Sequence, residues 1–264
     1  MAVISMLSDF GHLYPAQMKA VILRINPSAV LVDISHHIPA QGIKAGAFAL
    51  MVSAPYFPEG TVHLAVVDPG VGTSRRPIVV ESGAHLFVGP DNGLLIPAAF
   101  KLSQDFKVWE ITNPELFLIL SSTFHGRDIF APVAARLSLG MAASDVGNEI
   151  ADFVELDLGT LQVIDGKVRG QVVYVDSFGN VITNIPGEFV IKRFKFGDML
   201  DICGTTMPFV HTYISVKEGA PLALVGSHGY LEISVNLGNA VELLELDIGD
   251  IFDLIPFNSG PFVK

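Results

Sequence analysis

The chain has 264 residues and a formal net charge of −11, because 27 acidic residues outnumber 16 basic ones. This excess excludes a general electrostatic attraction to nucleic acid or to an anionic membrane surface, and we expect neither as a partner. Half of the residues are hydrophobic, yet no apolar run approaches the roughly 20 residues that span a bilayer. The composition predicts a folded globular protein of one large domain or two modest ones.

The start of the chain has no basic segment and reaches Asp9 too early for a signal peptide. The one cysteine, Cys203, cannot form an internal disulfide, and a lone thiol fits a reducing compartment. We therefore expect a cytoplasmic protein.

The first part of the chain alternates β-rich runs with longer segments of helical apolar spacing. The expected strands cover residues 3–8, 29–35, 61–67, 77–82, 85–89 and 106–111. The expected helices cover residues 14–26, 40–57, 93–102 and 128–140. This alternation predicts an α/β domain over residues 1–160 with a mainly parallel sheet and helices on its faces.

The pattern changes near 159–168. The later runs are short, alternating and punctuated by glycine, over 168–186, 198–204, 221–238 and 250–257. They predict an all-β, barrel-like domain over residues 161–264.

Polar side chains follow several of the first-half strands. These are Asp9, Asp33 with His36, Asp68, and Asp91 with Asn92. Ligands of an open parallel sheet bind beyond the carboxyl ends of the strands, so these side chains are expected to face one region. Each also has an ordinary explanation as a helix cap or turn residue, and for "PDNG" the turn is favoured. Asp9 suits either a cap or the paired hydroxyls of a ribose.

The segment "VVDPGVGTSRRPIVV" at 66–80 joins two predicted strands through a connector that contains an acid and two adjacent arginines, which a simple hairpin turn does not require. Gly70 and Gly72 allow a tight loop that returns Arg75 towards Asp68, where the acid would stay ionised and fix the guanidinium. The alternative is an ordinary surface ion pair. The loop is neither a Walker A sequence nor a complete GxGxxG, so the usual phosphate motifs do not apply.

Histidines occur in two notable places. His125 precedes a predicted helix at Asp128, a position that favours a neutral ring able to accept a proton or hydrogen bond. The adjacent His36 and His37 point in opposite directions on an extended segment, so a shared metal ion is not expected.

The β half contains two polar segments, "YVDSFGNVITNIP" with Asp176, Phe178 and Asn180, and "VGSHGYLEISVN" with Ser227. They are either glycine-containing turns or a face that offers an aromatic surface and amides to a planar base, with an acid and a hydroxyl for an amino acid.

Seven segments taken together resemble the S-adenosyl-L-methionine (SAM) hydroxide adenosyltransferases, relatives of the fluorinase and chlorinase. They are "SDFG", "MKAVILRINPSAVLVDISH", "GTVHLAVVDPGVGTSRRPIVV", "VGPDNGLL", "SSTFHGRDIFAPVAA", "VDSFGNVITNI" and "GSHGYLEISVN". The resemblance covers nearly the whole chain. It implies an α/β domain followed by a β-barrel, and a homotrimer that holds its substrate between neighbouring subunits.

The resemblance implies hydrolysis of SAM to adenosine and L-methionine by in-line attack of activated water on ribose C5′, with no metal and no cofactor besides the substrate. The family's catalytic triad falls on Asp68, Arg75 and His125. The halide-using relatives carry aromatic residues at the aspartate and histidine positions, so this chain favours water. Arg76 remains an alternative to Arg75.

The resemblance also implies the substrate contacts. Ribose would bind Asp9, adenine would lie near Asn180 and an aromatic ring, and the methionine end would lie near Asp176 and Ser227. Phe178 would wall the pocket. The aromatic ring is taken as Tyr213, with Phe209 as the alternative.

Two other functions stay open at this point. One is a SAM- or adenosine-binding protein with little or no turnover. The other is a metal-dependent hydrolase that uses Asp9, Asp33, His36 and Asp68.

Overall fold

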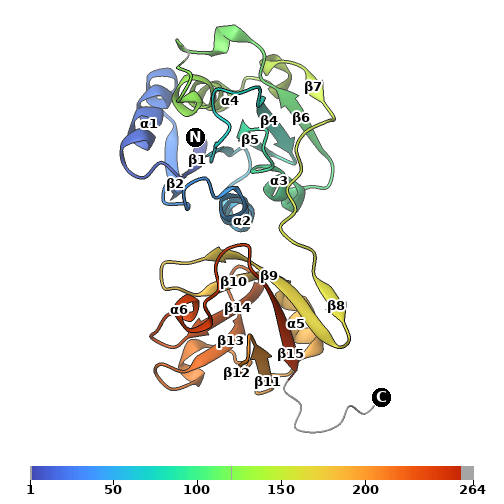
Figure 1. Ribbon diagram of the computed structural model, residues 1–264. Helices are drawn as coiled ribbons and strands as arrows, with labels where there is room; N and C mark the ends of the chain where they lie inside the picture. Colours follow the sequence, from blue (N-terminus) through green and yellow to red (C-terminus); the bar gives the residue numbers. More distant parts are fainter. Residues whose placement is uncertain (1, 120, 257–264) are drawn as a thin grey trace. The chain divides into compact units, whose positions relative to one another are not determined.

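The computed structural model describes residues 2–119 and 121–256 (Figure 1). The chain forms two compact units, Met1–Leu156 and Asp157–Lys264. Within the described ranges, no helix is both long and apolar enough to cross a membrane.

The first unit is built on a seven-stranded sheet in the order β2-β1-β3-β5-β4-β6-β7. The strands are β1 (Val3–Ser8), β2 (Val30–Ser35), β3 (Val62–Val66), β4 (Pro77–Ser82), β5 (His85–Pro90), β6 (Phe106–Glu110) and β7 (Glu149–Ile150). The neighbours β2, β1, β3 and β5 are parallel, whereas β4 and β7 run antiparallel to the strands beside them. The carboxyl ends of the four parallel strands therefore meet at one edge of the sheet.

Helices cover both faces of this sheet (Figure 1). They are α1 (Leu13–Ile25), α2 (Ile43–Ser53), α3 (Ile96–Leu102) and α4 (Ala131–Leu137). α1 and α4 pack together over the face that carries Ile4, Met6 and Leu64. α2 packs with α3 on the other face, where Gly46 lies against Leu7.

The burial of α1 follows from its sequence. Met18, Val21 and Ile22 recur at helical spacing and are buried against the sheet. The helix ends before Pro27, because the residue that precedes a proline is disfavoured in helical conformation. That residue, Asn26, is buried and donates to Ser138 beyond α4, which ties the two helices together.

The second unit is an eight-stranded antiparallel sheet in the order β12-β11-β15-β9-β10-β14-β13, with β8 beside β9. Its strands are β8 (Gln162–Ile164), β9 (Lys167–Val175), β10 (Val181–Pro186), β11 (Met199–Ile202), β12 (Thr205–Pro208), β13 (Pro221–Val225), β14 (Tyr230–Val235) and β15 (Ile251–Pro256). A bridge from Phe209 to Ala223 links the two edges, so the sheet is nearly closed around an apolar core. The predicted fold class is confirmed.

Several local predictions differ from the structure. The helix expected over 128–140 begins as a π-helical turn, Gly126–Phe130, before α4. The segment expected over 40–57 is helical only over α2 and ends in a 3₁₀ turn, Ala54–Tyr56. The short helices α5 (Gly187–Arg193) and α6 (Ala240–Leu244) were not predicted, because fewer than two turns give no recognisable period. Residue 257, at the end of the last predicted strand, lies outside the described residues.

Candidate active site

Three of the predicted site residues meet within the first unit. The Arg75 guanidinium binds the Asp68 carboxylate through two nitrogens, with Nε 3.1 Å from Oδ1 and Nη2 in contact with Oδ2. Nη2 also lies 3.2 Å from His125 Nδ1. The expected triad residues are thus in direct contact, although they come from segments 50 positions apart.

Glycine allows the loop between Asp68 and Arg75 to reach this arrangement. Gly72 has φ +78°, and a Cβ there would lie 2.4 Å from the carbonyl oxygen of Ser122. Only a residue without a side chain permits that approach, so the loop can pack on the segment that leads to His125. The π-helical turn follows immediately, and such turns often occur at functional sites.

The guanidinium of Arg75 is held in a dry environment. The side chains of Arg75 and Asp68 are only 8% and 4% exposed, and the Arg75 guanidinium carbon lies 5.3 Å from the centre of the Phe130 ring. Arg75 Nη1 is also buried and has no hydrogen-bond partner in the part of the chain that the structure describes. A buried cationic donor of this kind can stabilise negative charge that develops beside it.

The electrostatics keep His125 neutral. Burial lowers the pKa of its imidazole, and the nearby Arg75 cation lowers it further. Because arginine can only donate, Nδ1 of His125 accepts from Nη2, and the ring proton resides on Nε2. His125 therefore presents an N–H donor on the side away from Arg75.

Arg76 belongs to a different cluster. Its Nη2 lies 2.7 Å from Asp91 Oδ2, and its Nη1 lies 2.9 Å from Asp152 Oδ1. Asp91 also accepts from the backbone of Val154 at 2.8 Å. Arg76 thereby joins the carboxyl end of β5 to the 152–154 segment. Of the two arginines, Arg75 is the one that contacts Asp68 and His125.

The other acids at strand ends do not join the triad. Asp9 accepts from the backbone N–H of Gln41 at 2.8 Å and so holds the loop before α2. Asp33 forms ion pairs with Lys19 at 2.5 Å and with His36 at 3.1 Å. Within residues 2–119 and 121–256, no three His, Cys, Asp or Glu side chains form a group that fits a metal ion. The set proposed for a metal-dependent hydrolase is therefore not assembled here.

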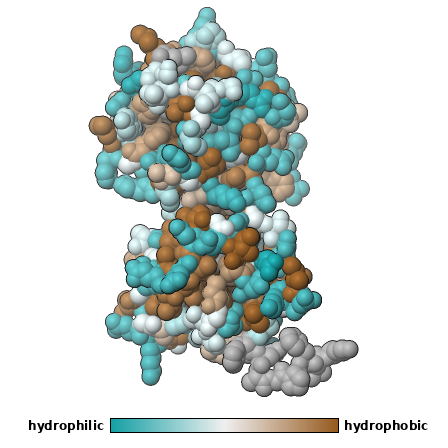
Figure 2. All heavy atoms as spheres, viewed as in Figure 1, coloured by the Kyte–Doolittle hydropathy of each residue, from teal (hydrophilic) through white to brown (hydrophobic). Residues whose placement is uncertain are grey.

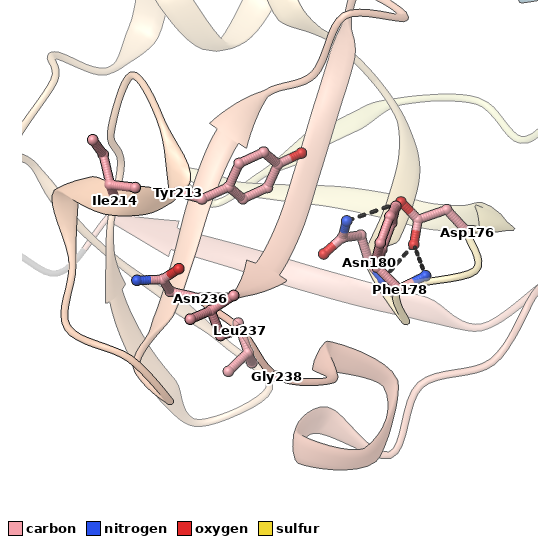
Figure 3. A pocket seen from close by; sticks show the side chains of 9 residues that line it. Asp176, Phe178, Asn180, Tyr213, Ile214, Asn236, Leu237 and Gly238 are labelled. Atoms are coloured by element: carbon pink, nitrogen blue, oxygen red, sulfur yellow. Dashed lines mark hydrogen bonds between the residues drawn. The ribbon is translucent and has the colours of Figure 1, made fainter.

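The second unit contains a pocket of about 450 Å³ (Figure 3). Its lining comes from the turn after β9, the segment after β12 and the end of β14. The residues are Asp176, Phe178, Asn180, Tyr213, Ile214, Val235, Asn236, Leu237 and Gly238. In Figure 3 the hydroxyl end of Tyr213 points to the side where Asp176 and Asn180 lie. The pocket is mostly apolar with a few polar groups, which is typical of small-molecule sites.

Asp176 organises one wall of this pocket. Its Oδ1 accepts from the backbone N–H groups of Phe178 and Asn180, each at 2.9 Å, and its Oδ2 accepts from Asn180 Nδ2 at 2.8 Å. The turn interpretation of this segment is thus correct, but the turn also lines the pocket. Because Asn180 Nδ2 donates to Asp176, the amide oxygen Oδ1 of Asn180 lies on the opposite side of the amide group from this contact.

Of the two candidate aromatic residues, Tyr213 and Phe209, one lines the pocket and the other does not. Tyr213 is 40% exposed and lines the cavity, whereas Phe209 is fully buried and stacks on Phe196 with ring centres 4.7 Å apart. The ring of Phe209 belongs to the barrel core, and this burial favours Tyr213 as the aromatic residue beside adenine. Ser227 lies exposed in the turn between β13 and β14 and is not among the lining residues.

The sequence interpretation missed several residues of the pocket. Ile214 and Leu237 are each 83% exposed, and Glu232 binds the hydroxyl of Tyr213 behind the wall. Glu232 carries no recognisable signal, because in "YLEISV" the acid alternates with apolar residues and such alternation predicts a side chain that faces solvent, whereas both faces of β14 are buried.

Comparison with known proteins identifies the family. Residues 4–147 match the family model described as the SAM hydroxide adenosyltransferase N-terminal domain, and residues 170–253 match its C-terminal domain. The chain belongs to this family, as the sequence segments indicate.

Individual relatives agree with this membership. The chain is 38% identical to a protein of Thermus thermophilus named (R)-S-adenosyl-L-methionine hydrolase, over 92% of this chain and 95% of that protein. It is 26% identical to a fluorinase of Nocardia brasiliensis, over 94% of each. It also resembles a crystal structure of an uncharacterized conserved protein from Thermotoga maritima, with a TM-score of 0.89, 39% identity, and coverage of 95% of this chain and 99% of that one.

Proposed function

We propose that the protein hydrolyses SAM to adenosine and L-methionine by attack of water on ribose C5′, with no metal and no cofactor besides the substrate. The observation that carries this proposal is the buried Arg75 guanidinium held between Asp68 and His125. Relatives that cover nearly the whole chain at 38% identity and are named as SAM hydrolases support it.

The difficult part of this reaction is the activation of water as the nucleophile. As the new C–O bond forms at C5′, the C5′–S bond breaks and its electrons neutralise the sulfonium. Methionine then leaves as a neutral thioether and needs no acid. Bulk water has a pKa of about 15.7, so its attack depends on positioned charges and hydrogen bonds.

The three residues of the triad meet this requirement in different ways. Arg75 stabilises the charge that develops on the attacking oxygen, and Asp68 fixes the guanidinium. His125 orients the water through its Nε2–H while Nδ1 accepts from Arg75. When that contact is released, Nδ1 accepts the proton that the water loses as the C–O bond forms, so the attacking oxygen has hydroxide character and adenosine forms as a neutral alcohol. In-line placement opposite sulfur supplies the rest of the acceleration.

The remaining predicted residues bind the substrate in this proposal. Asp9 accepts from the ribose hydroxyls. The ring of Tyr213 and the outer edge of Phe178 enclose adenine, and Asn180 offers Oδ1 to the adenine amino group. Asp176 and Ser227 serve the methionine end. The first unit thereby supplies the chemistry, and the barrel unit supplies the adenine and methionine contacts.

We further propose a cytoplasmic homotrimer with substrate held between neighbouring chains. Large apolar side chains around the barrel pocket support an assembly, because Phe178, Ile214 and Leu237 are 76%, 83% and 83% exposed. Figure 2 shows apolar side chains gathered on the viewed surface of this unit. Sedimentation of the purified protein tests the trimer directly.

Chromatography of SAM incubated with wild type and His125→Ala, in chelator and with or without fluoride or chloride, tests the reaction. The proposal predicts adenosine and methionine from wild type, unaffected by halide and by chelator. The His125→Ala variant is expected to turn over about 100-fold more slowly. Binding without product formation would reject hydrolysis and favour a SAM- or adenosine-binding protein.

A further inference from the structure

A buried carboxylate lies directly behind the barrel pocket. Glu232 on β14 is only 4% exposed, and its two oxygens accept from three side chains. Oε1 accepts from the Tyr213 hydroxyl at 2.6 Å and from Ser234 Oγ at 2.9 Å, while Oε2 lies 3.1 Å from His228 Nε2. One side chain thus connects a pocket wall to the turn that contains His228.

The direction of each hydrogen bond is fixed. The backbone N–H of Tyr230 donates to His228 Nδ1 at 3.2 Å, so Nε2 carries the ring proton and donates to Glu232. Burial and the neighbouring Glu232 raise the pKa of Tyr213, which keeps the phenol protonated as a donor. Burial alone would raise the pKa of Glu232, but bonds from His228, Tyr213 and Ser234 bring it below its usual value.

Burial of the Glu232 carboxylate in the barrel carries a desolvation cost. The one ion-pair partner of Glu232 in the described residues is His228, and a buried carboxylate without a permanent cation is costly compared with an apolar side chain. The backbone also leaves space for the contact, since a Cβ on Gly226 would lie 2.3 Å from His228 Nε2 and 2.6 Å from Glu232 Oε2.

We propose that Glu232 is a positioning residue that holds the Tyr213 ring and the Ser227–His228 turn in one fixed arrangement. The inference rests on the proposed function, in which Tyr213 encloses adenine and Ser227 serves the methionine end. A single carboxylate then sets the positions of both groups before substrate binds. The entropic cost of ordering these groups is therefore met during folding and does not weaken substrate binding.

The first test compares Glu232→Gln, Tyr213→Phe and the double variant by calorimetry with adenosine and by SAM turnover. Glutamine keeps the size of the side chain, but its amide N–H faces the His228 N–H, so one hydrogen bond is lost. Each single variant is expected to weaken adenosine binding and raise KM by about tenfold, with kcat within about twofold. The double variant is expected to bind adenosine more weakly than either single variant, because Glu232→Gln breaks the contact with His228 whereas Tyr213→Phe breaks the contact between Tyr213 and Glu232.

A second perturbation leaves the chemistry of the network unchanged. Gly226→Ala places a methyl group against His228 and Glu232, and it is expected to weaken adenosine binding to a similar degree. Thr183→Val is the matched control. It removes two buried hydrogen bonds of Thr183 Oγ1, to the carbonyl of Leu231 at 2.9 Å and from the N–H of Ile185 at 3.1 Å. Thr183 does not line the pocket, so this variant should lower Tm without changing adenosine affinity.

The outcomes separate the two proposals. If wild type neither binds adenosine nor cleaves SAM, the proposed function is wrong. If wild type does both, while Glu232→Gln lowers only Tm as Thr183→Val does, Glu232 is structural and the positioning inference is overturned.

Discussion

Arg75 and Arg76 are neighbours in the chain, yet their guanidinium groups bind different carboxylates. Arg75 turns to Asp68 and His125, whereas Arg76 turns to Asp91 and Asp152. The sequence alone could not assign them, because either arginine can follow a tight loop and pair with an acid. Matched variants at the two positions can therefore distinguish an effect on catalysis from an effect on stability.

We predict that lysine lowers kcat at only one of the two positions. Arg75→Lys keeps the charge but loses the two-nitrogen contact with Asp68 and the donor to His125, so kcat should fall about 100-fold, and Tm should fall as well because Asp68 is buried. Arg76→Lys should leave kcat near wild type and cost about 1 to 2 kcal/mol of stability, because Asp91 is buried and loses part of its partner. Rates of methionine release and thermal melts of both variants check this. Equal loss of kcat in both would contradict the assignment.

The elements of the fold were largely predictable, and the contacts between their connecting loops were not. Strands β1, β3 and β4 and helix α1 lie within one or two residues of their predicted positions, because periodicity and the Asn26-Pro27 stop specify them locally. The π-helical turn at Gly126 is set by packing, since its glycine lies against Phe124, Phe10 and Met18. Long-range packing of this kind leaves no periodic signal.

The loop that carries Arg75 depends on one close approach, and we predict that Gly72→Ala disrupts turnover. The new Cβ would lie 2.4 Å from the Ser122 carbonyl oxygen and push the loop away from the segment before His125. Gly60→Ala is the control, because its φ of +83° imposes similar backbone strain with no atom within 4 Å. Each variant should lose about 1 kcal/mol from the backbone alone. Only Gly72→Ala should also lower kcat, by about tenfold or more. Equal kcat values for the two variants would show that the approach to Ser122 does not position the triad.

For the molecule as a whole, the sequence predicted the α/β and barrel architecture, and family membership is confirmed. The barrel pocket was only partly predictable. Asp176, Asn180 and Tyr213, which the sequence analysis singled out, line it together with Ile214 and Leu237, whose turns depend on sheet closure. Ser227 was placed by resemblance alone and lies outside the lining.

The stability of the whole protein should fall on mild acidification because of one buried histidine. His63 is fully buried in the sheet, with Nδ1 2.6 Å from Ser5 Oγ and Nε2 3.1 Å from His85 Nδ1. Burial, with a smaller effect of His85, lowers the pKa of His63 from 6.5 to about 3. The unfolded chain therefore binds a proton that the folded chain refuses, so stability is greatest above pH 6.5 and declines as the pH falls towards 3.

For His63 alone, the loss between pH 7 and pH 5 should be about 2 kcal/mol. The pKa values of His36, His85 and His125 are also lowered, so these side chains act in the same direction. Urea unfolding of wild type and His63→Phe at the two pH values measures the effect. The variant is expected to show a smaller pH dependence whatever its absolute stability, since phenylalanine can stack on Phe87 as His63 does, with ring centres 4.7 Å apart, but cannot bind a proton. An unchanged pH dependence in His63→Phe would mean that other groups control the acid sensitivity of the protein.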